Sequence, residues 1–316
     1  MLTAFWQGVG SKLADRWSST AVGSLVFWAL GLGALAWRFG FGAAVTTVST
    51  WISARPALVQ GALVVGALVV VAGSASLVAR VTLPVTQVLE GYGWPFWLRW
   101  PLVRWTAWRV RRAEERFQRA EALKEDESLS GVARRRSVDR TARLELWLRR
   151  FPTEADLQEP ARLMPTRLGN VLRAAETRPT DKYGLDAVIC WPRLWLCMPD
   201  TARQELTAAR GALDTAIGAC CWAALFVVWT PWQPVALPAA VVFAVVAYRL
   251  WAVPRAAAYG ELVEAAFDLH RGELYTALRW PRPENPAQEH GAGKAVTSYL
   301  WRGSDAEKPV FEAPSS

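Results

Sequence analysis

The residues with the greatest chemical reactivity in this 316-residue chain are few and scattered, since it has only two histidines and four cysteines. His270 falls on the apolar face of an expected helix, which favours a packed, hydrogen-bonded histidine over a general base. His290 falls in a polar C-terminal tail, where we expect it to be solvated. Cys190 and Cys197 lack further ligands at the spacing of a zinc site. We therefore expect reduced, structural thiols.

Acid–base and nucleophilic chemistry find little support in the sequence. Asp186 and Glu176 are the best acidic candidates, but helix capping and pairing with arginine account for them more simply. The chain has no phosphate-binding glycine loop, no Gly-x-Ser-x-Gly, no His-Glu-x-x-His and no Cys-x-x-Cys. We predict no catalytic residue, no cofactor and no metal, and an enzyme is the least favoured class of function.

The elements that would position any site are dominated by one uncharged segment, residues 56–79, between Arg55 and Arg80. As a helix this segment would be about 36 Å long, enough to cross a hydrocarbon core of about 30 Å. It lacks the polar stripe of a helix on the surface of a soluble protein. The sequence therefore predicts a transmembrane helix here.

Further spans are expected on both sides of a basic middle region. A first span covers about Thr20 to Trp37, and residues 38–55, with their several threonines and serines, are expected to form a short exterior loop, the alternative being a re-entrant segment. The uncharged segment from Thr215 to Tyr248 is interrupted at Thr230–Pro234, which predicts a helical hairpin with its turn outside. Lys and Arg outnumber Asp and Glu between Arg80 and Arg210, which favours a cytoplasmic location for this region and for both termini.

The predicted fold is an all-α integral membrane protein of the inner (plasma) membrane, with two transmembrane helical hairpins flanking a helical cytoplasmic domain. An amphipathic helix over residues 255–279 is expected to place Tyr259, Leu262, Val263, Ala266, Phe267, His270, Leu274 and Leu278 on one face. The expected parts are an N-terminal cytoplasmic lead-in (1–19), a first hairpin (20–79), a basic Trp/Arg-rich cytoplasmic domain (80–210), a second hairpin (211–253), and the amphipathic helix with a loosely ordered cytoplasmic tail (254–316).

A segment that alternates indole rings with arginine follows the second span. Guanidinium groups bind lipid phosphates and indole rings lie at the acyl boundary, so we predict that this segment contacts the bilayer and its anionic headgroups. Stacking on nucleic-acid bases is the alternative, and the position directly after a span disfavours it. The predicted interface residues are Trp94, Trp97, Arg99, Trp100, Arg104, Trp105, Trp108 and Arg109.

Two further predictions concern packing in the membrane. Asp214 and Arg249 would lie at similar depth in the second hairpin and form an ion pair, the alternative being that each reaches water separately. Small residues share one face of the second span, which favours close helix packing over simple contact with lipid. These residues are Ala62, Gly66, Gly73 and Ser76.

The C-terminal half contains the most distinctive local signals. Thr166 is placed to cap a helix whose Leu168, Val171, Leu172 and Ala175 share one face, and Asp200 or Thr201 is placed to cap another. The segments Pro-Thr-Arg-Leu-Gly-Asn (165–170), Tyr-Gly-Leu-Asp-Ala-Val (183–188) and Trp-Pro-Arg-Leu-Trp (191–195) resemble a bacterial, mainly actinobacterial, family of multi-pass membrane proteins with no assigned activity. The tail from Phe267 to Gly303 resembles the same family. The resemblance implies a shared architecture and supplies no catalytic residue.

The function these features favour is an oligomeric membrane scaffold or receptor that presents a cytoplasmic domain to a protein partner. An oligomeric pore is the alternative. A coupled transporter is disfavoured because the expected spans carry no ionisable side chain at mid-membrane. We expect a homo-oligomer, and the sequence does not identify the protein partner.

Overall fold

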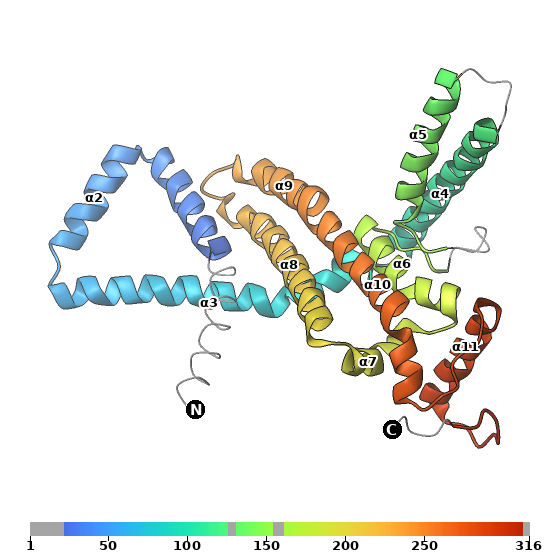
Figure 1. Ribbon diagram of the computed structural model, residues 1–316. Helices are drawn as coiled ribbons and strands as arrows, with labels where there is room; N and C mark the ends of the chain where they lie inside the picture. Colours follow the sequence, from blue (N-terminus) through green and yellow to red (C-terminus); the bar gives the residue numbers. More distant parts are fainter. Residues whose placement is uncertain (1–21, 126–130, 154–160, 312–316) are drawn as a thin grey trace. The chain divides into compact units, whose positions relative to one another are not determined.

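The computed structural model describes residues 22–125, 131–153 and 161–311, and in these residues every regular element is a helix. The all-α prediction is confirmed for this part of the chain. The expected N-terminal lead-in, residues 1–19, lies outside the described residues. Figure 1 shows the order of the helices along the chain.

The chain divides into two compact units. The first unit consists of residues 1–86 and 211–254, and the second of residues 87–210 and 255–316. Each of the three boundaries lies within a helix: α3 (Ala57–Glu90), α8 (Asp200–Leu225) and α10 (Val253–Ala277). The chain therefore passes from one unit to the other without a loop.

The first unit begins with a helix over Val22–Arg38 and continues, after a bend of 110°, into α2 (Phe41–Ser53). In place of the expected exterior loop, Phe41–Ser53 is helical, and the bent pair is either a broken span or the re-entrant segment that the sequence left as the alternative. Gly40, at φ +83°, turns the chain before α2. The threonines and serines that suggested a loop donate instead to carbonyls three or four residues earlier, as Thr47 does to Ala43 at 2.7 Å.

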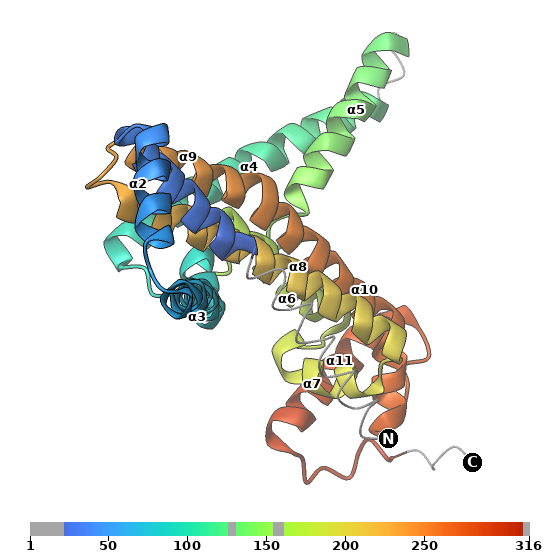
Figure 2. The same ribbon diagram turned by 90° about the vertical axis from the view of Figure 1, so that its left-hand side faces the viewer.

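The other half of the first unit is built from α8 and the helices that follow it. A short 3₁₀ helix, η1 (Phe226–Trp229), extends α8 up to the predicted proline break. The chain then returns through α9 (Ala236–Ala247) and the π-helical turn η2 (Tyr248–Ala252). In both views α8 and α9 lie side by side (Figures 1 and 2).

Three helices of the described chain are long and apolar enough to cross a membrane: Ala57–Glu90, Asp200–Trp229 and Ala236–Ala277. The number becomes four if the bent pair formed by the first helix and α2 counts as one span. Many apolar side chains on these helices are exposed, for example Leu58 at 86% and Val64 at 61%. Exposed apolar surface of this extent indicates a membrane protein.

The second unit contains α4 (Phe96–Glu125), α5 (Gly131–Leu148), α6 (Arg167–Tyr183) and α7 (Ala187–Cys197), together with the parts of α3, α8 and α10 that lie in it. The predicted cap of α6 is confirmed, because the Thr166 side chain accepts from the Gly169 amide at 2.9 Å. Asp186 caps α7 in the same way, accepting from the Ile189 amide at 3.1 Å. Caps of this kind satisfy amides that the helix itself leaves unpaired.

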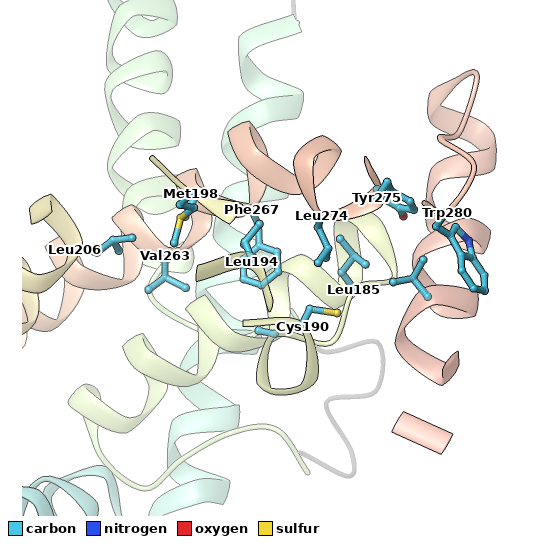
Figure 3. Packing of buried hydrophobic residues seen from close by; sticks show 13 residues of the cluster. Leu185, Cys190, Leu194, Met198, Leu206, Val263, Phe267, Leu274, Tyr275 and Trp280 are labelled. Atoms are coloured by element: carbon cyan, nitrogen blue, oxygen red, sulfur yellow. The ribbon is translucent and has the colours of Figure 1, made fainter. Parts of the chain in front are cut away.

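One apolar core lies between α7, α10 and α11 (Pro286–Arg302), and Figure 3 shows its side chains pointing toward one another. The predicted amphipathic face of residues 255–279 is confirmed, since its buried members join this core. Phe267 and Leu274 are fully buried, and Trp191 lies 6.0 Å from Phe267 between ring centroids. The buried members of the core are Leu185, Ala187, Cys190, Leu194, Met198, Leu206, Val263, Ala266, Phe267, Leu274, Tyr275, Trp280 and Val296.

The loosely ordered tail expected after residue 279 is wrong for residues 286–302, which form α11. Asn285 caps this helix by accepting from the Gln288 amide at 3.1 Å, and Pro286 occupies its first turn. Val296 is fully buried against the core. The abundance of Pro, Glu and Gly suggested disorder, whereas Pro286 occupies the first turn of α11 and Gly293 lies against the end of α6.

Candidate functional site

The Trp/Arg segment predicted to meet the membrane lies on the first half of α4 and just before it. Trp97 is 74% exposed and Trp105 54% exposed, although indole rings are commonly buried in helical proteins. Trp94 precedes the helix and donates to the Val88 carbonyl at 2.8 Å. The segment therefore presents large apolar rings outward.

Arginine side chains cover three of these rings at i,i+4 spacing. The distances from guanidinium carbon to ring centroid are 4.6 Å for Arg104 over Trp100, 4.7 Å for Arg109 over Trp105 and 4.0 Å for Arg112 over Trp108. Such cation–π contacts keep positive charge and apolar surface together on one helix. Arg112 was missed by the sequence analysis, although its spacing from Trp108 repeats that of the other two pairs.

The structure defines the surroundings of several reactive residues singled out in the sequence. His270 Nδ1 lies 3.1 Å from a Glu273 carboxylate oxygen. Burial raises the pKa of the Cys190 thiol to about 11, so the thiolate is scarce at neutral pH. Glu176 pairs with Arg173 at 3.3 Å. Within the described ranges, no group of three His, Cys, Asp or Glu side chains is arranged to hold a metal ion.

A network of charges joins α6 to α10 in the second unit, and the sequence analysis did not anticipate it. Glu264 contacts both Arg178 and Lys182, the latter at 2.5 Å from Nζ. Asp268 accepts from the Tyr183 hydroxyl at 2.5 Å. Burial, followed by this hydrogen bond, raises the pKa of Tyr183 to about 12. The network holds the two helices together.

The predicted small-residue stripe on α3 is exposed. A Cβ added at Gly66 or Gly73 would meet nothing within 4 Å, and Ala62 and Ser76 also face outward. Contacts within the chain use a different face of α3, on which Ala75 and Val78 are buried. Packing of the stripe against a second copy stays a prediction.

The predicted ion pair in the second hairpin also stays a prediction. Asp214 is half-buried on α8, and Arg249 is exposed in η2. Both belong to the first unit.

The closest packing in the first unit is an aromatic seam, which we define as Gly23, Phe27 and Gly31 of the first helix with Trp222 and Trp229. The Trp222 ring lies so close to Gly23 that an added Cβ would be 2.6 Å from it, and the Trp229 ring would be 2.0 Å from a Cβ at Gly31. Phe27 lies between them, with ring-centroid distances of 5.2 Å to Trp222 and 6.0 Å to Trp229. The two glycines stand at i,i+8 spacing, but the sequence did not indicate which rings they would meet.

Hydroxyl groups mark the point where the first helix contacts α3. Ser24 Oγ donates to the Val71 carbonyl at 2.9 Å and lies 2.8 Å from Ser74 Oγ. Trp28 Nε1 donates to Ser74 Oγ at 3.2 Å. These bonds pair polar groups that would otherwise be costly in an apolar environment.

Comparison with protein-family models, with curated proteins and with solved structures found no match for this chain. The function is therefore argued from the arrangement of its residues.

Proposed function

We propose that the chain is an oligomeric scaffold or receptor of the bacterial inner membrane that presents the second unit in the cytoplasm to a protein partner. The observation that carries the proposal is the contrast between the two units. The first consists of helices with exposed apolar side chains, whereas the second has a buried core of its own and joins the first through continuous helices. The family resemblance of the C-terminal half stays a prediction.

The partner surface we propose is the outer face of α7. Val188 and Leu196 are 70% and 76% exposed, with the exposed Pro192 between them at i,i+4 spacing. The opposite face of the same helix is anchored in the core by the fully buried Cys190 and Leu194. A rigid helix with an exposed apolar stripe is the usual form in which one protein presents a helix face to another.

Photocrosslinking tests this surface. A photoreactive residue in place of Leu196 is expected to form adducts with a second protein in cells, while the same residue in place of the exposed Glu205 of α8 is expected to form few. Mass spectrometry of the adducts identifies the partner. Adducts with lipid alone at position 196, or equal protein adducts at both positions, would contradict a partner surface on α7.

The exposed rings of α4 support a second element of the proposal, contact with the anionic membrane surface. Interfacial segments combine indole rings with arginine because ring and charge are then both favourably placed at the headgroup layer. The Arg–Trp pairs of α4 provide this combination within four turns of helix. Farther along the same helix Arg119 pairs with Glu115 at 3.7 Å, and both side chains are exposed.

A spin label tests the contact in the full-length protein. We place a spin label at Trp97→Cys in a Cys197→Ala background and reconstitute the protein in anionic nanodiscs. We expect the accessibility of this label to oxygen and to a nickel chelate to match that of labels in the headgroup layer. The control label at Arg119→Cys should show aqueous values. The other native thiols are buried and should label poorly. An aqueous value at position 97 would show that α4 does not contact the membrane.

The alternative function, an oligomeric pore, is favoured by the 110° bend between the first helix and α2. Backbone that breaks or turns back at membrane depth is tolerated where it is buried in protein or lines a water-filled cavity. If the protein is a scaffold, images of the purified protein should show particles that contain several copies of the chain. Liposomes containing the protein should then conduct no more ions than empty liposomes. Ion flux that depends on the protein would favour the pore, and single copies would contradict the oligomer.

A further inference from the structure

A cavity of about 320 Å³ lies within the first unit, between the first helix, α3 and the end of α8 with η1. Its volume is near the lower end of the range for small-molecule sites. Aromatic residues make up half of its lining, and no polar surface faces it. We call it the aromatic cavity; the rings that line it are Phe27, Trp28, Trp222, Trp229 and Trp232.

The polar atoms nearest to the aromatic cavity are turned away from it. The Trp28 N–H donates to Ser74 Oγ, and the Ser74 hydroxyl lies 3.0 Å from the Val71 carbonyl oxygen that it bonds. The Trp229 N–H is buried with no partner among the described residues, and its nitrogen lies beside Gly31, 2.4 Å from where a Cβ would stand. A molecule in the cavity therefore meets ring faces and aliphatic carbon only.

This lining selects strongly among possible ligands. A charged or hydrogen-bonding group would lose its solvation without gaining a partner, which costs about 2–7 kcal/mol for an unpaired amide or hydroxyl. Water is disfavoured for the same reason, because an ordered water needs two to four polar partners. A quinone ring would have to bury its carbonyl oxygens in this wall without a donor. A hydrocarbon chain has no such cost.

We propose that the aromatic cavity binds an acyl chain of a bilayer phospholipid. The helices that line it include two that are long and apolar enough to span a membrane, so acyl chains are the most abundant apolar molecules at its entrance. Binding follows from dispersion contacts between the methylene groups and the ring faces, because an empty cavity leaves its wall without partner atoms and lipid tails offer no hydrophobic driving force of their own. The headgroup stays outside the cavity.

Two neighbouring valines of η1 provide a matched pair of variants. Val228 lines the cavity and is 54% exposed, whereas Val227 is 42% exposed and does not line it. Val228→Trp is expected to fill the cavity, and Val227→Trp adds the same ring outside it. Both side chains are partly exposed, so neither change overpacks a buried core.

Native mass spectrometry of protein washed in mild detergent measures the bound lipid. The wild-type chain and Val227→Trp are expected to retain one phospholipid each, and Val228→Trp is expected to retain roughly tenfold less, a change of about 1.4 kcal/mol in binding. Equal retention by the two variants, or wild-type protein free of lipid, would overturn the proposal. A quinone in the extract in place of phospholipid would also overturn it.

A second measurement uses the wild-type protein alone, in case Val228→Trp does not fold. Washed protein is given a phospholipid whose acyl chain carries a diazirine and is then irradiated in detergent. Adducts are expected on the peptides that contain Trp28 and Trp229, and not on the exposed α3 residues Val64 and Val65. Adducts spread equally over both regions would show only non-specific contact and would overturn the proposal.

Discussion

Gly293→Ala is expected to destabilise the second unit by about 3 kcal/mol or more, at the upper end of the cost of overpacking. A Cβ at this position would lie 1.8 Å from the Tyr183 carbonyl oxygen and 3.1 Å from the Gly184 carbonyl carbon. Both are backbone atoms, so no side-chain rotation relieves the clash. To accommodate the methyl group, α11 has to separate from the end of α6 and expose the core that Val296 covers.

Gly291→Ala is the matched control, because it lies two residues earlier on the same helix and its added Cβ would meet nothing within 4 Å. Alanine favours a helix over glycine by about 0.8–1.0 kcal/mol, so this change is expected to be neutral or stabilising. Thermal unfolding of the purified protein, together with protease sensitivity of α11, compares the two variants. Equal stability for Gly293→Ala and Gly291→Ala would mean that α11 does not pack against α6 as described.

The sequence predicted the local part of this structure well. Thr166 and Asp186 act as caps as expected, since a cap depends on residues three positions apart in the chain. The apolar face of residues 255–279 was also predictable, because helical periodicity alone defines it. The positions of the Trp and Arg residues on α4 follow from the same helical periodicity. The structure adds that their side chains are exposed.

Other features depend on contacts between distant residues, and the sequence could not show them. The glycine of α11 that touches Tyr183 is 110 positions away from it in the chain. Composition favoured disorder in the segment that contains this glycine, because the segment is rich in Pro, Glu and Gly. Composition favoured a loop at α2, because α2 is rich in threonine and serine. The aromatic seam and the aromatic cavity likewise require the first helix and α8 to meet, which no periodicity in either segment specifies.

Gly31→Ala is expected to lower the stability of the first unit by about 1–3 kcal/mol. The added Cβ would lie 2.0 Å from the Trp229 ring, which is 9% exposed. The ring cannot move freely, since its centroid lies 5.9 Å from that of Trp28 and 6.2 Å from that of Trp232. Displacing it opens the seam that joins the first helix to η1.

Gly33→Ala provides the control on the same helix, since its added Cβ would meet nothing within 4 Å. The fraction of protein that stays monodisperse after heating in detergent should fall at a temperature about 2–12 °C lower for Gly31→Ala, taking 2–4 °C for each kcal/mol. Gly33→Ala should match the wild type. If both variants behave alike, the first helix does not pack on Trp229. If only Gly31→Ala is unstable, the close approach of a glycine to an indole ring holds the first helix in place, because the two changes add the same methyl group two residues apart.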